Sequence, residues 1–263
     1  MANPTSDDLT VFWQPGCSSC LNVKEYLSRH GVAFHSVNVL EDAAGLSRLR
    51  ALGVRQVPVV ARGTTWVDGQ ALDRVAELAG LALSRDRMLD PDELVKRIDG
   101  ILSLTGTYAS LIPETEYETR LPHRPRTYSG LACHIFEIVE AYLDLVEHEK
   151  RVEFEVYDHP VPPALRQRDS LLAFGADVRA RLQDWWQHKA EAVDLTAPAD
   201  VYFGDVTLHQ FLERSAWHAG QHLRQLERVL VEKLSIQPDR LLSDRDFDGL
   251  PMPRKVWDDQ LAF

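Results

Sequence analysis

The segment from residue 206 to residue 234, VTLHQFLERSAWHAGQHLRQLERVLVEKL, contains no proline and repeats apolar residues at helical spacing. The segment is therefore expected to form one long amphipathic helix. His218 and His222 lie four residues apart, on a stripe beside the apolar one, so both imidazoles can reach the same point. Two such histidines can ligate one divalent metal ion, but a third ligand must come from another part of the fold.

Composition limits the class of protein. The 263 residues allow one large domain or two ordinary ones, and a hydrophobic fraction of 44% is sufficient for a packed core. The formal net charge of −11 argues against nucleic acids and anionic membrane surfaces as general partners. No run approaches the ~18 apolar residues of a membrane span, and the N-terminal sequence does not resemble a secretory signal. With three cysteines, too few for a disulfide framework, a cytoplasmic protein with reduced thiols is expected.

Residues 9 to 80 alternate short β-runs with helical patterns. The run LTVFW is followed by a loop, a helix that stops at Gly31, a second β-run and a short helix. Two further β-runs, with a turn near residues 62 and 63, and a final helix complete the segment. The order β-α-β-α-β-β-α predicts a small α/β domain.

Cys17 and Cys20 form a C-x-x-C motif where the first β-run meets the first helix. The positive end of a helix stabilises a thiolate and lowers its pKa. Cys17 is therefore the candidate nucleophile, and Cys20 is the candidate thiol that attacks a mixed disulfide formed on Cys17. The alternative is half of a zinc site, but the sequence contains no second C-x-x-C pair.

This setting of the cysteine pair, together with Val57 and Pro58 after the second helix, makes residues 9–80 resemble a glutaredoxin. The resemblance implies a thioredoxin-like fold in which the cysteine pair is redox-active. Pro58 would be the cis-proline beside the sulfur, and the Val57 backbone would contact the cysteinyl part of glutathione or a similar low-molecular-weight thiol. Asp68 and Gly69 occupy the place where the family usually carries two glycines, and they would contribute to the same binding site.

The chain is expected to divide into domains at residues 1–82 and 83–263. The second part contains four helical segments joined by loops of ten or more residues, several of them rich in proline, at residues 90–112, 131–149, 170–191 and 206–234. This pattern predicts an all-α four-helix bundle.

The best candidate for the third metal ligand is His134, which lies in an apolar run of the second helical segment and should face inward. Opposite His218 and His222 it would complete a three-histidine site with open coordination positions, which is typical of a catalytic metal. The alternative is an ordinary core histidine. Glu137 and Glu213 are each near a candidate ligand on the helix surface; either could contact that ligand, but both are expected to be solvated carboxylates. One histidine in the second helix and H-x-x-x-H in the fourth resemble the DinB/YfiT superfamily of metal-dependent enzymes, over about residues 88–235.

The two resemblances together predict a thiol-dependent metalloenzyme. DinB-like proteins are similar to thiol transferases and isomerases, and a divalent ion (zinc, nickel or iron(II)) with open positions lowers the pKa of a bound thiol. We expect a glutathione-using transferase, lyase or isomerase that acts on a small electrophile and is coupled to thiol–disulfide exchange. One alternative is a glutaredoxin-type reductase whose bundle only binds a partner or forms a homodimer. The other is a non-catalytic sensor of metals or thiols.

Overall fold

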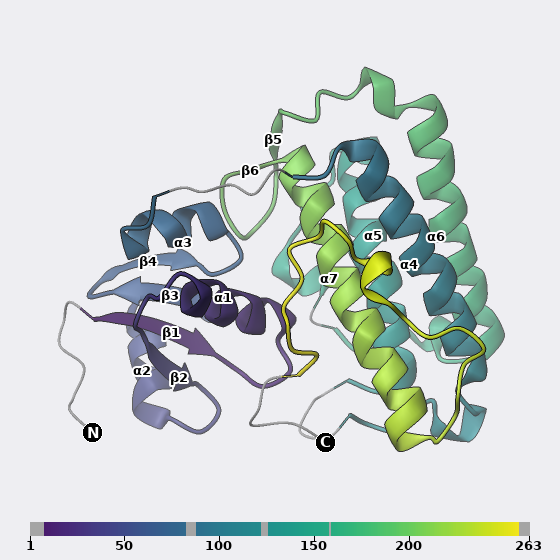
Figure 1. The fold of residues 1–263 in the computed structure, drawn as a ribbon, viewed down its shortest axis with the longest axis horizontal. Coiled ribbons are helices and arrows are strands. Elements are labelled where there is room, and N and C mark those ends of the chain that lie inside the picture. Colours follow the sequence, from purple (N-terminus) through teal and green to yellow (C-terminus); the bar gives the residue numbers. More distant parts are fainter. Residues whose placement is uncertain (1–7, 83–87, 122–125, 158, 258–263) are drawn as a thin grey trace. The chain divides into compact units, whose positions relative to one another are not determined.

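The computed structural model of the protein describes residues 8–82, 88–121, 126–157 and 159–257. The chain divides into two units, Met1–Asp86 together with Pro253–Phe263, and Arg87–Met252. The prediction of a thioredoxin-like α/β domain followed by a helical domain is confirmed (Figure 1). No helix of the described residues is both long and apolar enough to cross a lipid bilayer.

The C-terminal segment differs from the domain limits expected from the sequence, which gave all of 83–263 to the helical part. The backbone N–H groups of Arg254 and Lys255 donate to the carboxylate of Glu25 at 2.6 and 3.1 Å. These contacts join residues 254 and 255 to the first unit, across more than 200 positions of sequence.

The first unit is a four-stranded sheet in the order β2-β1-β3-β4. Strand β1 pairs with β2 in parallel, and the β1–β3 and β3–β4 pairs are antiparallel. The strands are β1 (Leu9–Trp13), β2 (His35–Asn38), β3 (Val59–Arg62) and β4 (Thr65–Asp68), and the helices are α1 (Ser18–Arg29), α2 (Ala43–Ala51) and α3 (Leu72–Ala79).

Both faces of this sheet are apolar and covered. Val11 of β1 packs in one cluster with Val23 of α1 and Val75 of α3. The next residue, Phe12, points to the other face and packs with Leu49 of α2. Because side chains alternate along a strand, β1 can supply both clusters. Since β1 is held from both faces, the loop that follows it, which carries the cysteine pair, begins at a fixed position.

The second unit is built from four helices of 21 residues each, α4 (Pro91–Leu111), α5 (Tyr128–His148), α6 (Arg168–His188) and α7 (Leu208–Arg228). The helix predicted from residue 206 begins two residues later than expected. Residues Val206–Thr207 form strand β6, which pairs with β5 (Pro198–Ala199). Thr207 then caps the helix, because its hydroxyl accepts the Gln210 N–H while the Gln210 side chain accepts the Thr207 N–H.

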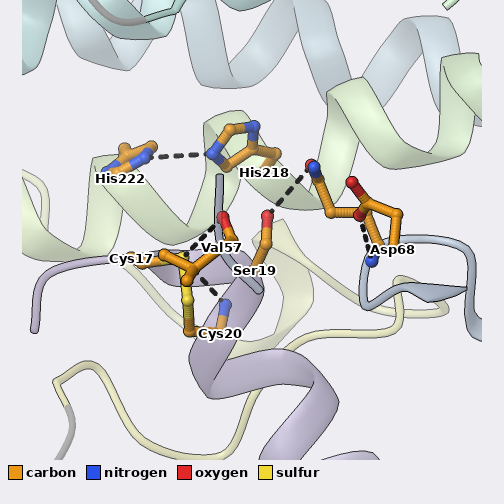
Figure 2. Close-up of a disulfide and its surroundings, with 8 residues drawn as sticks. Cys17, Ser19, Cys20, Val57, Asp68, His218 and His222 are labelled. Carbon is orange, nitrogen blue, oxygen red and sulfur yellow. Dashed lines mark hydrogen bonds between the residues drawn. A yellow bond between two sulfur atoms is a disulfide. The ribbon is translucent and has the colours of Figure 1, made fainter. Parts of the chain in front are cut away.

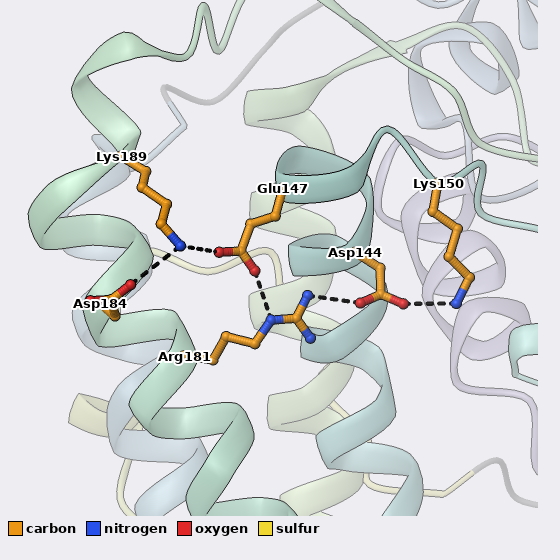
Figure 3. Close-up of polar contacts among 6 residues, drawn as sticks. All are labelled: Asp144, Glu147, Lys150, Arg181, Asp184 and Lys189. Atoms are coloured by element: carbon orange, nitrogen blue, oxygen red, sulfur yellow. Dashed lines mark hydrogen bonds and ion pairs between the residues drawn. The ribbon is translucent and has the colours of Figure 1, made fainter.

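A charged network joins α5 to α6 (Figure 3). The Glu147 carboxylate, only 7% exposed, accepts hydrogen bonds from Arg181 Nε and Lys189 Nζ, both at 2.7 Å. Arg181 also donates to Asp144 at 2.8 Å, and Asp144 accepts from Lys150 at the same distance. Burial alone would raise the pKa of Glu147, but the hydrogen bonds from Lys189 and Arg181 outweigh it, and the net pKa is lowered.

We expect Glu147→Ala to lower the free energy of unfolding by about 1–2 kcal/mol at pH 7, because it leaves two cations without their shared carboxylate. A carboxyl group whose pKa is lower in the folded than in the unfolded protein stabilises the fold at pH values above its unfolded pKa. This contribution is lost as the pH falls through the pKa of the folded protein. The difference between wild type and variant should therefore vanish in acid. Urea denaturation between pH 7 and pH 3 tests this, with exposed Glu191→Ala as control; a difference that grows in acid would contradict it.

Candidate functional site

The cysteine pair lies at the beginning of α1. Cys17 is the N-cap residue, and its sulfur accepts the Cys20 N–H at 3.1 Å. The two sulfur atoms form a disulfide (Figure 2). Cys17 is partly exposed, whereas Cys20 is completely buried. In the reduced protein the Cys17 sulfur is thus the accessible one, and the helix end that surrounds it stabilises a thiolate.

The residues predicted to bind a thiol gather around this pair. The backbone oxygen of Val57 lies 4.0 Å from the Cys17 sulfur, and the Val57–Pro58 peptide is cis, as the glutaredoxin resemblance predicted. Gly69 donates its N–H to the Pro58 oxygen at 2.9 Å. A Cβ atom at Gly69 would lie 2.8 Å from the Pro58 Cβ, so the close approach of the two loops requires glycine.

Asp68 shapes the turn that follows β4. Its carboxylate accepts the Gln70 N–H at 2.9 Å, and the Gln70 side chain in turn accepts a hydrogen bond from the Ser19 hydroxyl at 3.3 Å (Figure 2). This contact ties the turn to the helix of the cysteine pair. Neither Ser19 nor Gln70 belongs to a recognisable motif, because only the fold brings these two polar residues together.

The three predicted metal ligands converge in the helical unit. His134 comes from α5 and His218 and His222 from α7; all three are buried, and one possible ligand atom of each lies within 4.8 Å of the others. The Nε2 atoms of His218 and His222 are 3.2 Å apart (Figure 2). Two nitrogens bound to one tetrahedral zinc ion at ~2.0–2.1 Å would lie roughly 3.3–3.4 Å apart. The observed spacing therefore fits a shared ion.

The hydrogen bonding of the rings also suits a metal site. The Nδ1 atom of His222 lies 2.8 Å from the side-chain oxygen of Gln225. An amide oxygen only accepts, so Nδ1 carries the hydrogen and the Nε2 lone pair faces His218. The Nδ1 atoms of His134 and His218 are buried without a hydrogen-bond partner among the described residues. Gln225 was not identified from the sequence, although it lies on the same face of α7, three residues after His222.

The electrostatic setting favours neutral imidazoles. Burial lowers the pKa of His134 and His218 well below the ordinary histidine value. The nearby positive charges act in the same direction, chiefly Arg126 on His134 and Arg214 on His218. Neutral imidazole is the form that ligates metals, and a low pKa keeps it available near neutral pH.

Glu137 is not the solvated carboxylate expected from the sequence. Its side chain is 12% exposed, and its oxygens lie 3.9 Å from His134 Nδ1 and 3.4 Å from His159 Nε2. It also accepts a hydrogen bond from the buried Cys133 thiol at 3.3 Å. Burial raises the pKa of Glu137, although His159 opposes the shift. One helical turn places Glu137 beside His134, and the packing of the 159 loop against α5 then covers it.

A dithiol pair at a helix N-terminus beside a cis-proline, on a four-stranded sheet of this order, defines a thiol–disulfide redox domain with a thioredoxin-like fold. The glutaredoxin family model matches residues 9–67. The chain is 30% identical over 71 residues to the glutaredoxin-like protein NrdH of Lactococcus lactis subsp. cremoris (strain MG1363), and equally to NrdH of L. lactis subsp. lactis (strain IL1403). Each match covers 99% of the relative and 27% of this chain. The chain thus belongs to the glutaredoxin family through its N-terminal unit.

Proposed function

We propose that the protein is a thiol-dependent metalloenzyme, in which thiol–disulfide exchange at the cysteine pair accompanies thiol transfer or isomerisation at a divalent metal ion. One observation supports the proposal most directly: three histidines from two helices are buried and lie close enough to share one ion. They are His134, His218 and His222. The Nε2 atoms of His218 and His222 face each other at 3.2 Å, a spacing that suits two ligands of one ion. The same arrangement, one histidine on α5 and H-x-x-x-H on α7, supports placing the helical unit in the DinB-like superfamily.

The exchange reaction uses the two cysteines in turn. The Cys17 thiolate attacks a substrate disulfide, forms a mixed disulfide and releases one thiol. The Cys20 thiolate then attacks the Cys17 sulfur, releases the second thiol and leaves the Cys17–Cys20 disulfide. The dithiol has supplied two electrons, and two molecules of a low-molecular-weight thiol return the pair to its reduced form. The exposure of Cys17 and the burial of Cys20 support this order of attack.

The proposed thiol is glutathione or a similar small molecule, with its cysteinyl part along the Val57 backbone and its remainder against Asp68 and Gly69. The Val57 oxygen lies next to the Cys17 sulfur, and Gly69 is hydrogen-bonded to Pro58. These contacts support one continuous binding edge around the Cys17 sulfur.

At the second centre, a divalent ion with open positions would lower the pKa of a bound thiol and supply a thiolate nucleophile at neutral pH. Residues of the chain keep the histidines in the state and orientation that metal binding needs. The burial of His134 and His218 keeps both rings neutral, Gln225 fixes the orientation of His222, and Glu137 lies beside His134. Three imidazoles suit zinc, nickel or iron(II), and a small electrophile is the proposed second substrate.

Elemental analysis of the purified protein tests the proposal. Wild type is expected to hold about one divalent ion per chain, whereas His218→Ala should lose it, because two imidazoles bind far more weakly than three. His148→Ala is the matched control, since His148 is exposed at the end of α5. Wild-type protein that takes up no zinc, nickel or iron(II) on reconstitution would refute the metalloenzyme and leave a glutaredoxin-type reductase.

A further inference from the structure

The helical unit contains a pocket of about 640 Å³ beside the first half of α5. Gly130 and Glu137 line it, and they share a face of α5 with His134, because residues three and four apart stack on one side of a helix. Glu137 also lies 3.9 Å from His134. A ligand in the pocket would therefore touch a side chain that itself contacts the histidine cluster.

The pocket is rich in arginine although the chain as a whole carries a net charge of −11. Arg120, Arg126 and Arg166 all line it. A guanidinium presents planar, paired donors that match a carboxylate. The wall of the pocket thus offers several sites for a negatively charged group.

The helix end itself is not the binding element. The first backbone N–H groups of α5 are already used, since Tyr128 donates to the Thr119 oxygen and Ser129 to the Tyr117 oxygen, at 2.9 and 3.2 Å. Gly130 N–H donates to the Thr127 hydroxyl at 3.0 Å. Side chains of the pocket lining, and not the helix end, are therefore the donors for an anion, and the three arginines are the charged donors among them.

The same walls carry negative charge. Glu118 and Glu137 line the pocket together with the three arginines, and His159, which also lines it, lies 3.4 Å from Glu137. Phosphate bound to the arginines would still lie near these carboxylates, and their repulsion would weaken its binding. A zwitterion avoids that repulsion, because its ammonium group pairs with a glutamate while its carboxylate pairs with an arginine. The volume also fits a ligand of tripeptide size better than a single small ion.

We propose that this pocket binds an amino-acid-derived zwitterion, with its carboxylate on the arginines and its ammonium group on Glu118 or Glu137. The inference goes beyond the proposed function, and it holds with or without a metal ion at the histidines. It assigns to the helical unit a ligand site built from that unit's own residues.

Calorimetric titration of the full-length protein with S-methylglutathione tests the proposal. The methylated sulfur can neither exchange with the disulfide nor ligate a metal as a thiolate, so the titration reports non-covalent binding. The arginine variants assign that binding to the pocket, because they leave the thiol-binding edge of the glutaredoxin unit intact. Arg120→Gln and Arg126→Gln should each weaken binding about tenfold or more, because each removes a charge-assisted pair. Arg245→Gln, exposed and outside the pocket, should bind as wild type does. Removal of metal by a chelator should leave the affinity unchanged.

Three results would overturn the proposal: no binding by wild type, wild-type affinity in both arginine variants, or binding of succinate or inorganic phosphate as tight as that of S-methylglutathione. Affinity that disappears with the metal would assign the ligand to the histidine centre instead. Arg126 also donates to the Tyr157 oxygen at 3.1 Å, so circular dichroism checks the fold of that variant. Arg120 is exposed and provides the independent test.

Discussion

Cys17→Ser is expected to lower the rate of disulfide reduction about a thousandfold or more. A serine hydroxyl does not ionise near neutral pH, so the variant lacks the thiolate that attacks the substrate. The helix end that stabilises a negative sulfur at this position gives a neutral hydroxyl little help. The initial rate of reduction of bis(2-hydroxyethyl) disulfide measures the effect. Cys133→Ser serves as control, because that cysteine is buried in the helical unit and should not affect the rate.

Cys20→Ser should behave differently, and the contrast tests the order of attack. Its Cys17 remains nucleophilic, but the thiol that resolves the mixed disulfide is gone. The variant should therefore accumulate an adduct on Cys17, which mass spectrometry detects as the added mass of one half of the substrate disulfide. An adduct on Cys20 in the Cys17→Ser variant, or wild-type turnover by that variant, would show that the assigned roles are reversed.

The parts of this protein that the sequence predicted are those that local pattern determines. A β-run followed by C-x-x-C and a helix specifies the redox loop, because strand, cap and helix are neighbours in the chain. Helical periodicity specified four helices, and the spacing of His218 and His222 put their rings together on one turn. His134 could be chosen only as a histidine in an apolar run, and the packing of α5 against α7 brought it to the other two.

What the sequence could not predict depends on contacts between distant segments. The Ser19–Gln70 hydrogen bond joins residues 51 positions apart, and neither polar residue is distinctive by itself. Glu137 looked like a surface carboxylate because its burial comes from the 159 loop and not from its own helix. Strand β6, before α7, has only two residues, which is too few to show a β-period in the sequence; its strand character depends on its pairing with β5.

Trp185→Ala should cause the largest loss of stability, about 3–5 kcal/mol in the free energy of unfolding of the helical unit. The Trp185 ring on α6 is completely buried and meets Tyr142 of α5 edge-on, with 5.5 Å between ring centroids. Tyr142 in turn packs on Phe211 of α7 at 5.4 Å. The stack of Trp185, Tyr142 and Phe211 therefore joins three helices, including both that carry the histidines, and alanine at residue 185 would leave a cavity at one end of this stack.

Two variants provide matched comparisons. Trp186→Ala should cost only about 1 kcal/mol, because the neighbouring indole is partly exposed and loses one hydrogen bond to Asp92. Trp185→Phe should cost much less than Trp185→Ala, because the Nε1 atom of Trp185 has no hydrogen-bond partner among the described residues, and phenylalanine keeps most of the apolar volume. Circular dichroism is used to monitor urea denaturation, because the variants remove a tryptophan and so change the tryptophan fluorescence. Equal costs for Trp185→Ala and Trp186→Ala would contradict the assignment.

The same denaturation series connects stability to the metal proposal. A ligand that binds only the folded unit raises its apparent stability, by ~2.7 kcal/mol at a free concentration one hundred times the dissociation constant. Zinc in such excess should therefore restore a large part of the stability that Trp185→Ala loses, because the three histidines themselves are intact in that variant. The recovery should be absent when His218→Ala is added. If zinc stabilises both proteins equally, it acts away from the three histidines, and the convergence of α5 and α7 serves packing alone.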